Sequence, residues 1–532
     1  LLASLALLGL LAACGGGDGE GDAPEITVLS TRADLVSGGD ALLEVKLPNA
    51  ADAQSVRVTL NGVDVTDRFA VRPNGRYQGL VTGLREGTNE LIARVSKGAS
   101  QRAAALTVTN HSKQGPIISG PQVEPYICET ELFGLEPSAP PKCEAPTKYE
   151  FFYKPVGSTE TDPFEVYDPN SPPADSEIKV TTTDHGQTVP FIVRRERGVI
   201  NRGVYDIAVL HQPGHERQPW GERGAWNGKL LMMFGGGTKN WHRQALDGTG
   251  SLVDPLTRAP AVRGILNVLS PTAELGQASQ LRGDVPLARG FAVMTSTIAQ
   301  VNNPVTSTET AMMVKEHLIE TYGPVRYTIG IGCSGGSMMQ HLTANNYPGL
   351  IDGLIPQCAL PDMWTATVND AAFSYTLLHR YMSQTSPQLW PEKSDRVAVN
   401  GGVDADALAG TQFAYDLWIK PTASCTSFDP ASEPQWVYDP VDNPGGGRCA
   451  MQDFQKQIFG TRAPSVWGPV ESQLGRGFAN SPLDNVGVQY GLEALQQGEI
   501  SPEQFVDLNL KVGGADIDGN WTSQRAEANR EG

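Results

Sequence analysis

RYTIGIGCSGGSMMQHLTANNYPGLIDGLIP, residues 326–356, alternates strand-like and helix-like segments. Its first part, residues 326–332, is a short apolar run typical of a buried strand, and residues 350–356 form a second such run. Between them, the chain from Ser334 to about Asn346 predicts a helix. Strands that alternate with helices indicate a parallel sheet with right-handed crossovers. The expected fold class is therefore α/β, with a mostly parallel sheet.

The segments before this stretch extend the same pattern. Further strands are predicted at FIVRRERGVINRGVYDIAVLHQP (191–213, two strands and a glycine-containing turn), KLLMMF (229–234) and FAVMTSTI (291–298). A helix is expected next, starting at a capping box formed by Thr306 and Glu309 and ending at Gly323-Pro324. One face of this helix should be apolar: Ala311, Val314, Leu318 and Tyr322.

A G-x-S-x-G motif occupies the predicted turn between strand and helix: Gly332-Cys333-Ser334-Gly335-Gly336. In a strand–turn–helix unit this motif places the serine on a strained turn, where only residues without a Cβ fit on either side. Ser334 is therefore the predicted nucleophile of a serine hydrolase. The structural alternative is a glycine-rich turn that only holds a helix N-terminus.

Acyl transfer also requires hydrogen-bond donors that point at the developing oxyanion. One expected donor is the backbone N–H of Gly335, directly after the nucleophile. The second is expected from the glycine run 235–237, which follows a predicted strand, with Gly235 or Gly236 as the donor. Taken alone, this run could equally be a phosphate-cradling turn or a plain loop.

The catalytic histidine is not evident from the sequence. All eight histidines precede residue 380, whereas hydrolases with this motif take their histidine from a late loop, after the serine and the acid. His317 and His341 lie in helices that flank the strand before the motif, so we interpret them as structural. His242 is expected to line the pocket, and His379 could reach the site only if a cap folds back.

We therefore expect the catalytic histidine to lie beyond Gly532. The catalytic acid is likewise not evident from the sequence. Asp362 follows a predicted strand tip and is the candidate, although such hydrolases usually take their acid from the following strand. The acidic segment 516–520 has its glycine in the wrong place for a calcium loop, so a polar turn is expected there.

Cysteines indicate an oxidising compartment, because an even number remains once Cys14 is set aside. The six are Cys128, Cys143, Cys333, Cys358, Cys425 and Cys449. They form no C-x-x-C pair and have no nearby histidine cluster, so we expect neither a zinc site nor a cofactor. The simplest of fifteen pairings is sequence-local: 128 with 143, 333 with 358, and 425 with 449. The strands near residues 333 and 358 should be neighbours about 4.8 Å apart, a separation that fits a disulfide.

The N-terminal residues predict an export signal. LLASLALLGLLAA (1–13) is too short to span a bilayer but has the length of a signal-peptide core. The sequence Leu11-Ala12-Ala13-Cys14 resembles the lipobox of bacterial lipoproteins, in which the cysteine becomes lipidated, and a glycine-rich tether follows it. We expect the sequence to begin inside the signal peptide, and Cys14 to anchor the protein in a bacterial cell envelope, facing the periplasm or the exterior. A buried apolar helix is the alternative.

Composition bounds the partners. The chain has 532 residues, of which 40% are hydrophobic and 19% charged, so it belongs to the globular class. Its formal net charge is −18, and the basic residues are scattered along the sequence. Nucleic acid is therefore not an expected partner.

The domain organisation is expected to have four parts. Residues 1–23 are a partial lipoprotein signal peptide and tether. Residues 24–110 predict an immunoglobulin-like β-sandwich, because six alternating segments are separated by turn signals: 25–30, 41–48, 55–66, 76–83, 89–96 and 104–110. This sandwich is expected to act as a spacer, with glycan binding as the alternative. Residues 111–190 form a Pro-rich connector and the start of a catalytic domain. Residues 191–532 form the catalytic domain, C-terminally incomplete, with a cap at about 362–515.

Two resemblances add to these interpretations. GIGCSGGSMMQHLTANNYPGLIDGLIPQCALPD (330–362) resembles the nucleophile region of the tannase and feruloyl esterase family, and so implies the α/β-hydrolase superfamily. In that family the cysteine beside the serine bonds a cysteine next to the catalytic histidine. The chain up to Gly532 does not contain that cysteine, which implies that Cys333 is paired differently. A longer likeness, over most of residues 115–520, is to large bacterial secreted proteins of unknown function with hydrolase-like features. Those proteins continue past the point that matches Gly532.

The function predicted from these features is a secreted carboxylic-ester hydrolase. It would act through an acyl-enzyme on Ser334, and its substrate would be an extracellular ester, either a phenolic ester or a polyester oligomer. A serine peptidase or amidase of the same fold is one alternative. A catalytically silent surface protein, in which the hydrolase fold is only a scaffold for binding, is the other.

Overall fold

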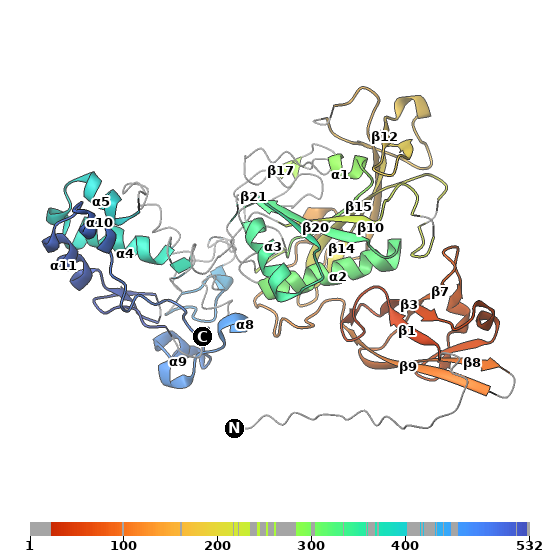
Figure 1. The fold of residues 1–532 in the computed structure, drawn as a ribbon, viewed down its shortest axis with the longest axis horizontal. Helices are drawn as coiled ribbons and strands as arrows, with labels where there is room; N and C mark the ends of the chain where they lie inside the picture. Colours follow the sequence, from red (N-terminus) through yellow and green to blue (C-terminus); the bar gives the residue numbers. More distant parts are fainter. Residues whose placement is uncertain are drawn as a thin grey trace.

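The computed structural model contains an N-terminal β-sheet region, a central eight-stranded sheet and a helical C-terminal part (Figure 1). It describes residues 23–528 except 98–99, 160–161, 216, 222, 235–241, 245–251, 254–259, 262–283, 299–303, 334, 358, 360–367, 370–371, 402–414, 416–418, 420–430, 432–433, 440, 448–455 and 518.

The N-terminal region consists of two sheets that share one apolar cluster. Their strands run in the orders β1-β3-β7-β6 and β2-β9-β8-β4-β5. The bounds are β1 Glu25–Val28, β2 Val36–Ser37, β3 Asp40–Lys46, β4 Val56–Leu60, β5 Val63–Asp64, β6 Phe69–Val71, β7 Tyr77–Thr82, β8 Gly87–Lys97 and β9 Ser100–His111. Val58 of one sheet and Leu43 of the other are fully buried in the shared cluster. All six predicted strand segments are confirmed, while the short strands β2 and β6 were not expected.

The central sheet has the strand order β11-β10-β14-β15-β19-β16-β20-β21. The bounds are β10 Lys148–Tyr153, β11 Glu165–Val166, β14 Ile192–Ile200, β15 Gly203–Leu210, β16 Lys229–Met233, β19 Ala292–Ser296, β20 Tyr327–Cys333 and β21 Gly353–Gln357. The strands predicted from residue 191 onward all fall on members of this sheet. Three two-stranded antiparallel sheets stand outside it in the described residues. Two of them precede α1 in the chain, β12 Val180–Thr182 with β13 Thr188–Pro190 and β17 Leu252–Val253 with β18 Pro260–Ala261.

The sheet is mixed rather than mostly parallel, which corrects that part of the prediction. Strands β19, β16, β20 and β21 pair in parallel, whereas β11, β10, β14 and β15 pair antiparallel, as do β15 and β19. The difference comes from β10 and β11, which the Pro-rich composition of the connector hid from the sequence pattern. They extend the sheet beyond β14, so four of its seven strand pairs are antiparallel and three are parallel.

Helices cover both faces of the sheet. On one face, Leu230 and Met232 of β16 pack in a cluster with α2 (Pro304–Tyr322) and α3 (Gly335–Asn346). On the other, Leu231 and Met233 pack in a cluster with α1 (Asp284–Ala288). This alternation follows from the two-residue period of a strand. Residues 230–233 of β16, which contact both layers, are accordingly all apolar and buried.

Helix α2 begins earlier than predicted. It starts at Pro304, so Thr306 lies inside the helix and the predicted capping box is wrong. The carboxylate of Glu309 instead accepts hydrogen bonds from the backbone N–H groups of residues 117, 118 and 119, at 2.9, 2.6 and 2.8 Å. The predicted stop at Gly323 is confirmed, and the predicted apolar face is buried. A long-range contact with the connector therefore replaces the expected local cap.

The connector carries a disulfide between Cys128 and Cys143, with the Cα atoms 5.2 Å apart. This is one of the three predicted pairings. Residues 402–414, 420–430 and 448–455, and with them Cys425 and Cys449, lie outside the described residues, as does Cys14.

The C-terminal part is mainly helical where it is described. Its helices are α4 Tyr375–Arg380, α5 Lys393–Val399, α8 Lys456–Phe459, α9 Pro469–Leu474, α10 Leu492–Gln497 and α11 Pro502–Lys511, followed by the hairpin β22 Gly514–Ala515 and β23 Trp521–Thr522. In Figure 1, α4, α5, α10 and α11 form a group apart from the central sheet. The predicted polar turn at 516–520 connects the hairpin strands, and Asn520 donates its backbone N–H to Asp516 Oδ1 at 2.8 Å. Whether this part caps the catalytic domain stays a prediction.

Candidate functional site

The predicted nucleophile lies at the junction of β20 and α3. Strand β20 ends at Cys333 and helix α3 begins at Gly335, so the strand–turn–helix context expected for the motif is present around residue 334. Ser334 itself lies outside the described residues. Gly335, the expected donor after the nucleophile, is buried in the first turn of α3. The structure thus describes both sides of the turn.

The glycines on either side of residue 334 pack closely together. A Cβ added at Gly332 would lie 2.7 Å from the carbonyl oxygen of Phe234 and 2.9 Å from the backbone of Gly336. Real Cβ atoms essentially never approach other atoms this closely, so residue 332 has to be glycine for the turn to close. The motif therefore has the steric reason that the sequence suggested.

The strand before the glycine run ends beside this turn. Strands β16 and β20 are parallel neighbours, with Met233 opposite Ile331, and Phe234 N–H donates to Ile331 O at 2.9 Å. Gly235 and Gly236, the expected second oxyanion donors, lie outside the described residues. The last described residue before them, Phe234, contacts the glycine two positions before Ser334. The chain segment that leads to the glycine run is therefore a neighbour of the segment that leads to Ser334. This holds as far as Phe234, the last described residue before the glycine run.

Gln340 is a buried residue of this site that the sequence did not reveal. It lies on α3, is fully buried, and contacts backbone groups of Gly332, Gly336 and Ile355. A glutamine among helical residues carries no pattern that marks it as functional. Its one signal is position, because it lies almost two helical turns after Ser334, on a helix packed against β20 and β21.

Cys333 and Cys358 remain an untested pair. Strand β21 runs parallel to β20, and Cys333 is opposite Gln357. Directly opposite residues share a face of the sheet, so a bridge to residue 358 requires the chain to leave the strand pattern after Gln357. Cys358 and the side chain of Cys333 lie outside the described part of the structure.

The described histidines have varied surroundings. His317 bonds Glu196 and lies 3.2 Å from the hydroxyl of Tyr205, in agreement with a structural role. His242 is buried, and its Nδ1 lies 2.7 Å from the carbonyl oxygen of Pro125 in the connector. His379 lies on α4, and among the described residues no contact joins its ring to the β20–α3 junction. Asp362 lies outside the described residues, so the catalytic histidine and acid stay predictions.

A second cluster of ionisable groups lies where the N-terminal sheets meet α2. Glu316 accepts the backbone N–H of Ser37 at 3.0 Å and lies 2.5 Å from its hydroxyl. Glu320, one turn further along α2, is buried, and its Oε1 has no hydrogen-bond partner. With Asp40, Lys113 and His317, these residues line a cavity of about 100 Å³.

Burial shifts the protonation of this cluster. It raises the pKa of Glu316 to about 8, against the opposing hydrogen bonds from Ser37. The pKa of Glu320 is also raised, first by burial and then by the charges of Glu316 and Asp40. Burial likewise raises the pKa of Asp40 and lowers that of Lys113. Glu316 therefore favours its protonated form at neutral pH, and the pKa values of Glu320 and Asp40 are shifted in the same direction.

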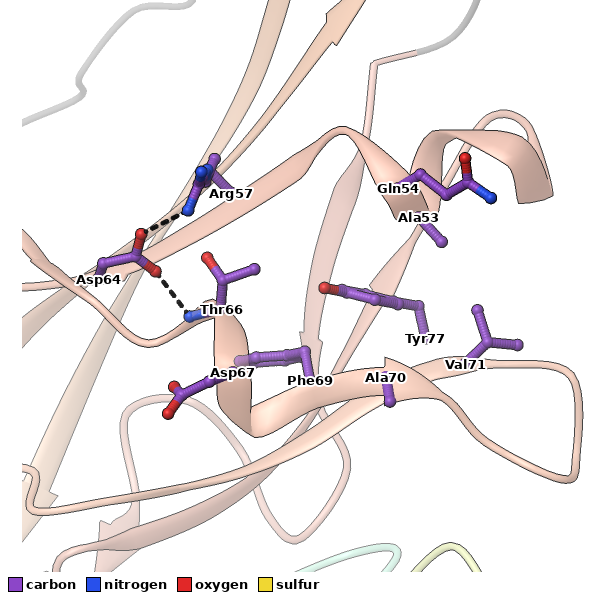
Figure 2. A pocket seen from close by; sticks show the side chains of 10 residues that line it. All are labelled: Ala53, Gln54, Arg57, Asp64, Thr66, Asp67, Phe69, Ala70, Val71 and Tyr77. Atoms are coloured by element: carbon purple, nitrogen blue, oxygen red, sulfur yellow. Dashed lines mark hydrogen bonds and ion pairs between the residues drawn. The ribbon is translucent and has the colours of Figure 1, made fainter.

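Figure 2 shows an open pocket of about 590 Å³ in the N-terminal region, between η1 (Ala50–Gln54), η2 (Thr66–Arg68) and β6. Its polar groups bond one another, as Asp64 accepts hydrogen bonds from Arg57 at 3.1 Å and from Thr66 N–H at 2.9 Å. The rings of Phe69 and Tyr77 stack on each other and are largely buried. Aromatic faces are thus not presented to a ligand here, so the pocket does not support the glycan-binding alternative.

The described residues contain neither a metal-binding cluster nor a membrane-spanning helix. Within this part of the chain, no group of three or more His, Cys, Asp or Glu side chains is arranged to hold a metal ion. Among the described helices, none combines the length and apolar composition needed to cross a membrane.

The family of the protein follows from comparison with known proteins. The model of a tannase-like family of unknown function (DUF6351) matches residues 26–532. The chain belongs to this family. No curated protein matches it. The match to the tannase-like family includes the N-terminal sheets, the connector and the C-terminal helices, so the tannase resemblance of residues 330–362 is part of a relationship that spans nearly the whole chain. The family description names no reaction or substrate.

Proposed function

We propose that this member of the tannase-like family is a carboxylic-ester hydrolase whose nucleophile is Ser334. One observation carries the proposal. The β20–α3 junction, where residue 334 lies, packs directly against Phe234, the residue before the glycine run, through a glycine contact that tolerates no side chain. A nucleophile and a source of oxyanion donors would meet at this point.

The strand order supports an α/β-hydrolase type of fold. From β14 onward, the spatial order of the six strands is β14-β15-β19-β16-β20-β21. It differs from their order along the chain only in the exchange of β16 and β19. The second strand is antiparallel and the rest of this set is parallel. In such hydrolases the fifth strand along the chain carries the nucleophile turn, and the third strand along the chain precedes the oxyanion loop. In the chain order of these six strands, β20 is the fifth and β16 the third, which supports the proposed roles of residues 334 and 235–236.

The proposed chemistry is acyl transfer through a covalent intermediate. The Ser334 hydroxyl oxygen attacks the ester carbonyl carbon while a histidine base accepts its proton, and the carbonyl oxygen becomes an oxyanion stabilised by backbone N–H groups. The alkoxide leaves as an alcohol after taking the proton from the base. Water then attacks the acyl-enzyme in the same way, which releases the carboxylic acid and restores Ser334.

The relationship to tannases favours phenolic esters among the possible substrates, and polyester oligomers are the second class that we propose.

The decisive experiment compares the full-length gene product with its Ser334→Ala variant on aryl esters, polyester oligomers and matched amides. We expect the wild type to cleave esters, and the variant to lose activity by on the order of 10⁴-fold. Preferential cleavage of amides would favour the peptidase alternative. No turnover by folded wild type on any of them would favour a silent binding protein.

We also propose that the protein is exported and attached to the bacterial envelope by a lipid on Cys14. The support is the sequence of residues 1–14 alone. Metabolic labelling with a fatty-acid analogue should mark the wild type and not a Cys14→Ser variant. Equal labelling of both would contradict the proposal.

A further inference from the structure

The amide of Gln340 connects three backbone segments around the predicted nucleophile. Its Nε2 donates to the carbonyl oxygens of Gly332 at 3.2 Å, Gly336 at 3.1 Å and Ile355 at 3.4 Å. Its Oε1 accepts the backbone N–H of Ile355 at 3.0 Å. The side chain is fully buried, so water does not compete for these groups.

Two of these contacts lie symmetrically about the turn. Gly332 and Gly336 are the residues two positions before and two positions after Ser334. One NH₂ group bonds the carbonyls of both, so it links the end of β20 to the first turn of α3. Gly330 also leaves space for the aliphatic part of the Gln340 side chain, because a Cβ added at Gly330 would lie 3.1 Å from Gln340 Cγ.

The remaining contacts attach the turn to the next strand. Gln340 bonds both the N–H and the C=O of Ile355 in β21, as the peptide group of an adjacent strand would. Leaving such buried groups unpaired would cost about 1–3 kcal/mol each. The Gln340 amide thus adds a side-chain link between the turn and β21 to the direct pairing of β20 with β21.

We infer that Gln340 is a positioning residue, which fixes the Ser334 turn between β20, α3 and β21 and so sets the angle at which the serine meets the ester carbonyl. The inference rests on the hydrolase function proposed above. Gln340 does not touch the substrate. It acts through the backbone on either side of the nucleophile.

Two substitutions separate the donor and acceptor roles. Gln340→Glu keeps the oxygen that accepts Ile355 N–H and removes the two N–H donors. Gln340→Met has a similar length but removes the donors and the acceptor. The control is Asn345→Asp, which makes the same amide-to-acid change at an exposed position on α3. The measurement is the second-order rate constant for labelling by a fluorophosphonate probe in the full-length gene product, together with kcat and KM on an aryl ester.

We expect both Gln340 variants to label on the order of 100-fold more slowly, because displacement of a reacting group by about 1 Å costs about that factor. The loss should appear in kcat, with KM little changed, and Asn345→Asp should label at the wild-type rate. In Gln340→Glu, burial raises the pKa of the new carboxyl group, so its protonated form regains one donor at low pH. The rate of this variant relative to wild type should therefore rise as the pH falls.

Hydrogen exchange at Ile355 N–H checks that the variants fold and that the contact exists. Protection of this amide should persist in Gln340→Glu and fall in Gln340→Met, while exchange elsewhere in the central sheet is unchanged. Labelling of both variants at the wild-type rate would overturn the positioning role and leave the hydrolase proposal intact. A folded wild type that does not label would overturn the hydrolase proposal, and the positioning role with it.

Discussion

Side chains of different size have complementary roles around the predicted nucleophile. Gly330 leaves space for the stem of Gln340, and Gly332 leaves space for Phe234 and Gly336. The Gln340 amide then bonds buried backbone groups of Gly332 and Ile355 at this close approach. The described residues on both sides of position 334 are thus held in close contact with one another.

Gly332→Ala tests this packing. The added Cβ meets backbone atoms at 2.7 and 2.9 Å, which cannot move aside as a flexible side chain would. We expect a loss of about 1–3 kcal/mol in the free energy of unfolding and a severe loss of fluorophosphonate labelling. Gly445→Ala is the control, because a Cβ there meets nothing within 4 Å. Equal labelling of Gly332→Ala and wild type would contradict the proposed turn.

At the scale of elements, local patterns predicted most of the N-terminal strands and six strands of the central sheet, and non-local contacts explain two of the features that they missed. The alternating segments of residues 25–110 and the apolar runs from residue 191 onward fall on observed strands. The T-x-x-E capping box failed because Glu309 bonds residues nearly two hundred positions earlier in the chain. The Pro-rich segment concealed β10, which pairs with β14, and β11, which pairs with β10. The motif predicts Ser334 as the nucleophile, which stays a prediction, whereas Gln340 could be recognised only after its three backbone partners were seen together.

Glu309→Gln should loosen the connector from α2. The buried carboxylate accepts three backbone N–H groups and the hydroxyl of Ser119, and an amide would turn a donor toward some of them. We expect a loss of about 3 kcal/mol in the free energy of unfolding, measured by urea titration. Glu131→Gln, at an exposed position of the connector, should change it by less than about 0.5 kcal/mol. Equal midpoints for both variants would contradict the anchoring role.

The Cys128–Cys143 disulfide should stabilise the same connector. It closes a loop of 15 residues, for which chain entropy gives about 3 kcal/mol. The double variant Cys128→Ser, Cys143→Ser should therefore unfold at a lower urea concentration than the wild type. Reductant should lower the midpoint of the wild type toward that of the variant. A midpoint unaffected by either change would show that the bridge contributes little.

At the scale of the whole molecule, the N-terminal sheets are part of the folded core and not only a tethered spacer. Leu35 and Leu42 belong to the same apolar cluster as Met313 of α2. Ser37 bonds Glu316 of that helix, and the Arg72 guanidinium lies 3.5 Å from the ring centre of Trp220. The family match over residues 26–532 agrees with this continuity.

The contact between these parts should weaken as the pH rises. A carboxyl group whose pKa is higher in the folded state contributes stability that is fully present below its unfolded value and is lost as the pH rises through the folded value. For Glu316, that window runs from about 4.5 to about 8, and Glu320 and Asp40 shift in the same direction. We expect the free energy of unfolding to fall across this range by on the order of 1 kcal/mol per pH unit.

Glu316→Gln mimics the protonated side chain and should flatten this slope. Glu90→Gln changes an exposed carboxylate of the same N-terminal region and should leave the slope as it is. Urea titrations at pH 5, 6, 7 and 8 give the comparison. A wild-type stability that is constant or rises over this range would contradict the protonation assigned to the cluster.

The nucleophile is tested most directly by locating a covalent adduct. The full-length gene product is treated with a fluorophosphonate, digested, and the modified residue is identified by mass spectrometry. We predict one stoichiometric phosphonyl group on Ser334, absent after Ser334→Ala. A folded protein that remains unmodified, or that carries the adduct on another residue while Ser334 stays free, would contradict the account.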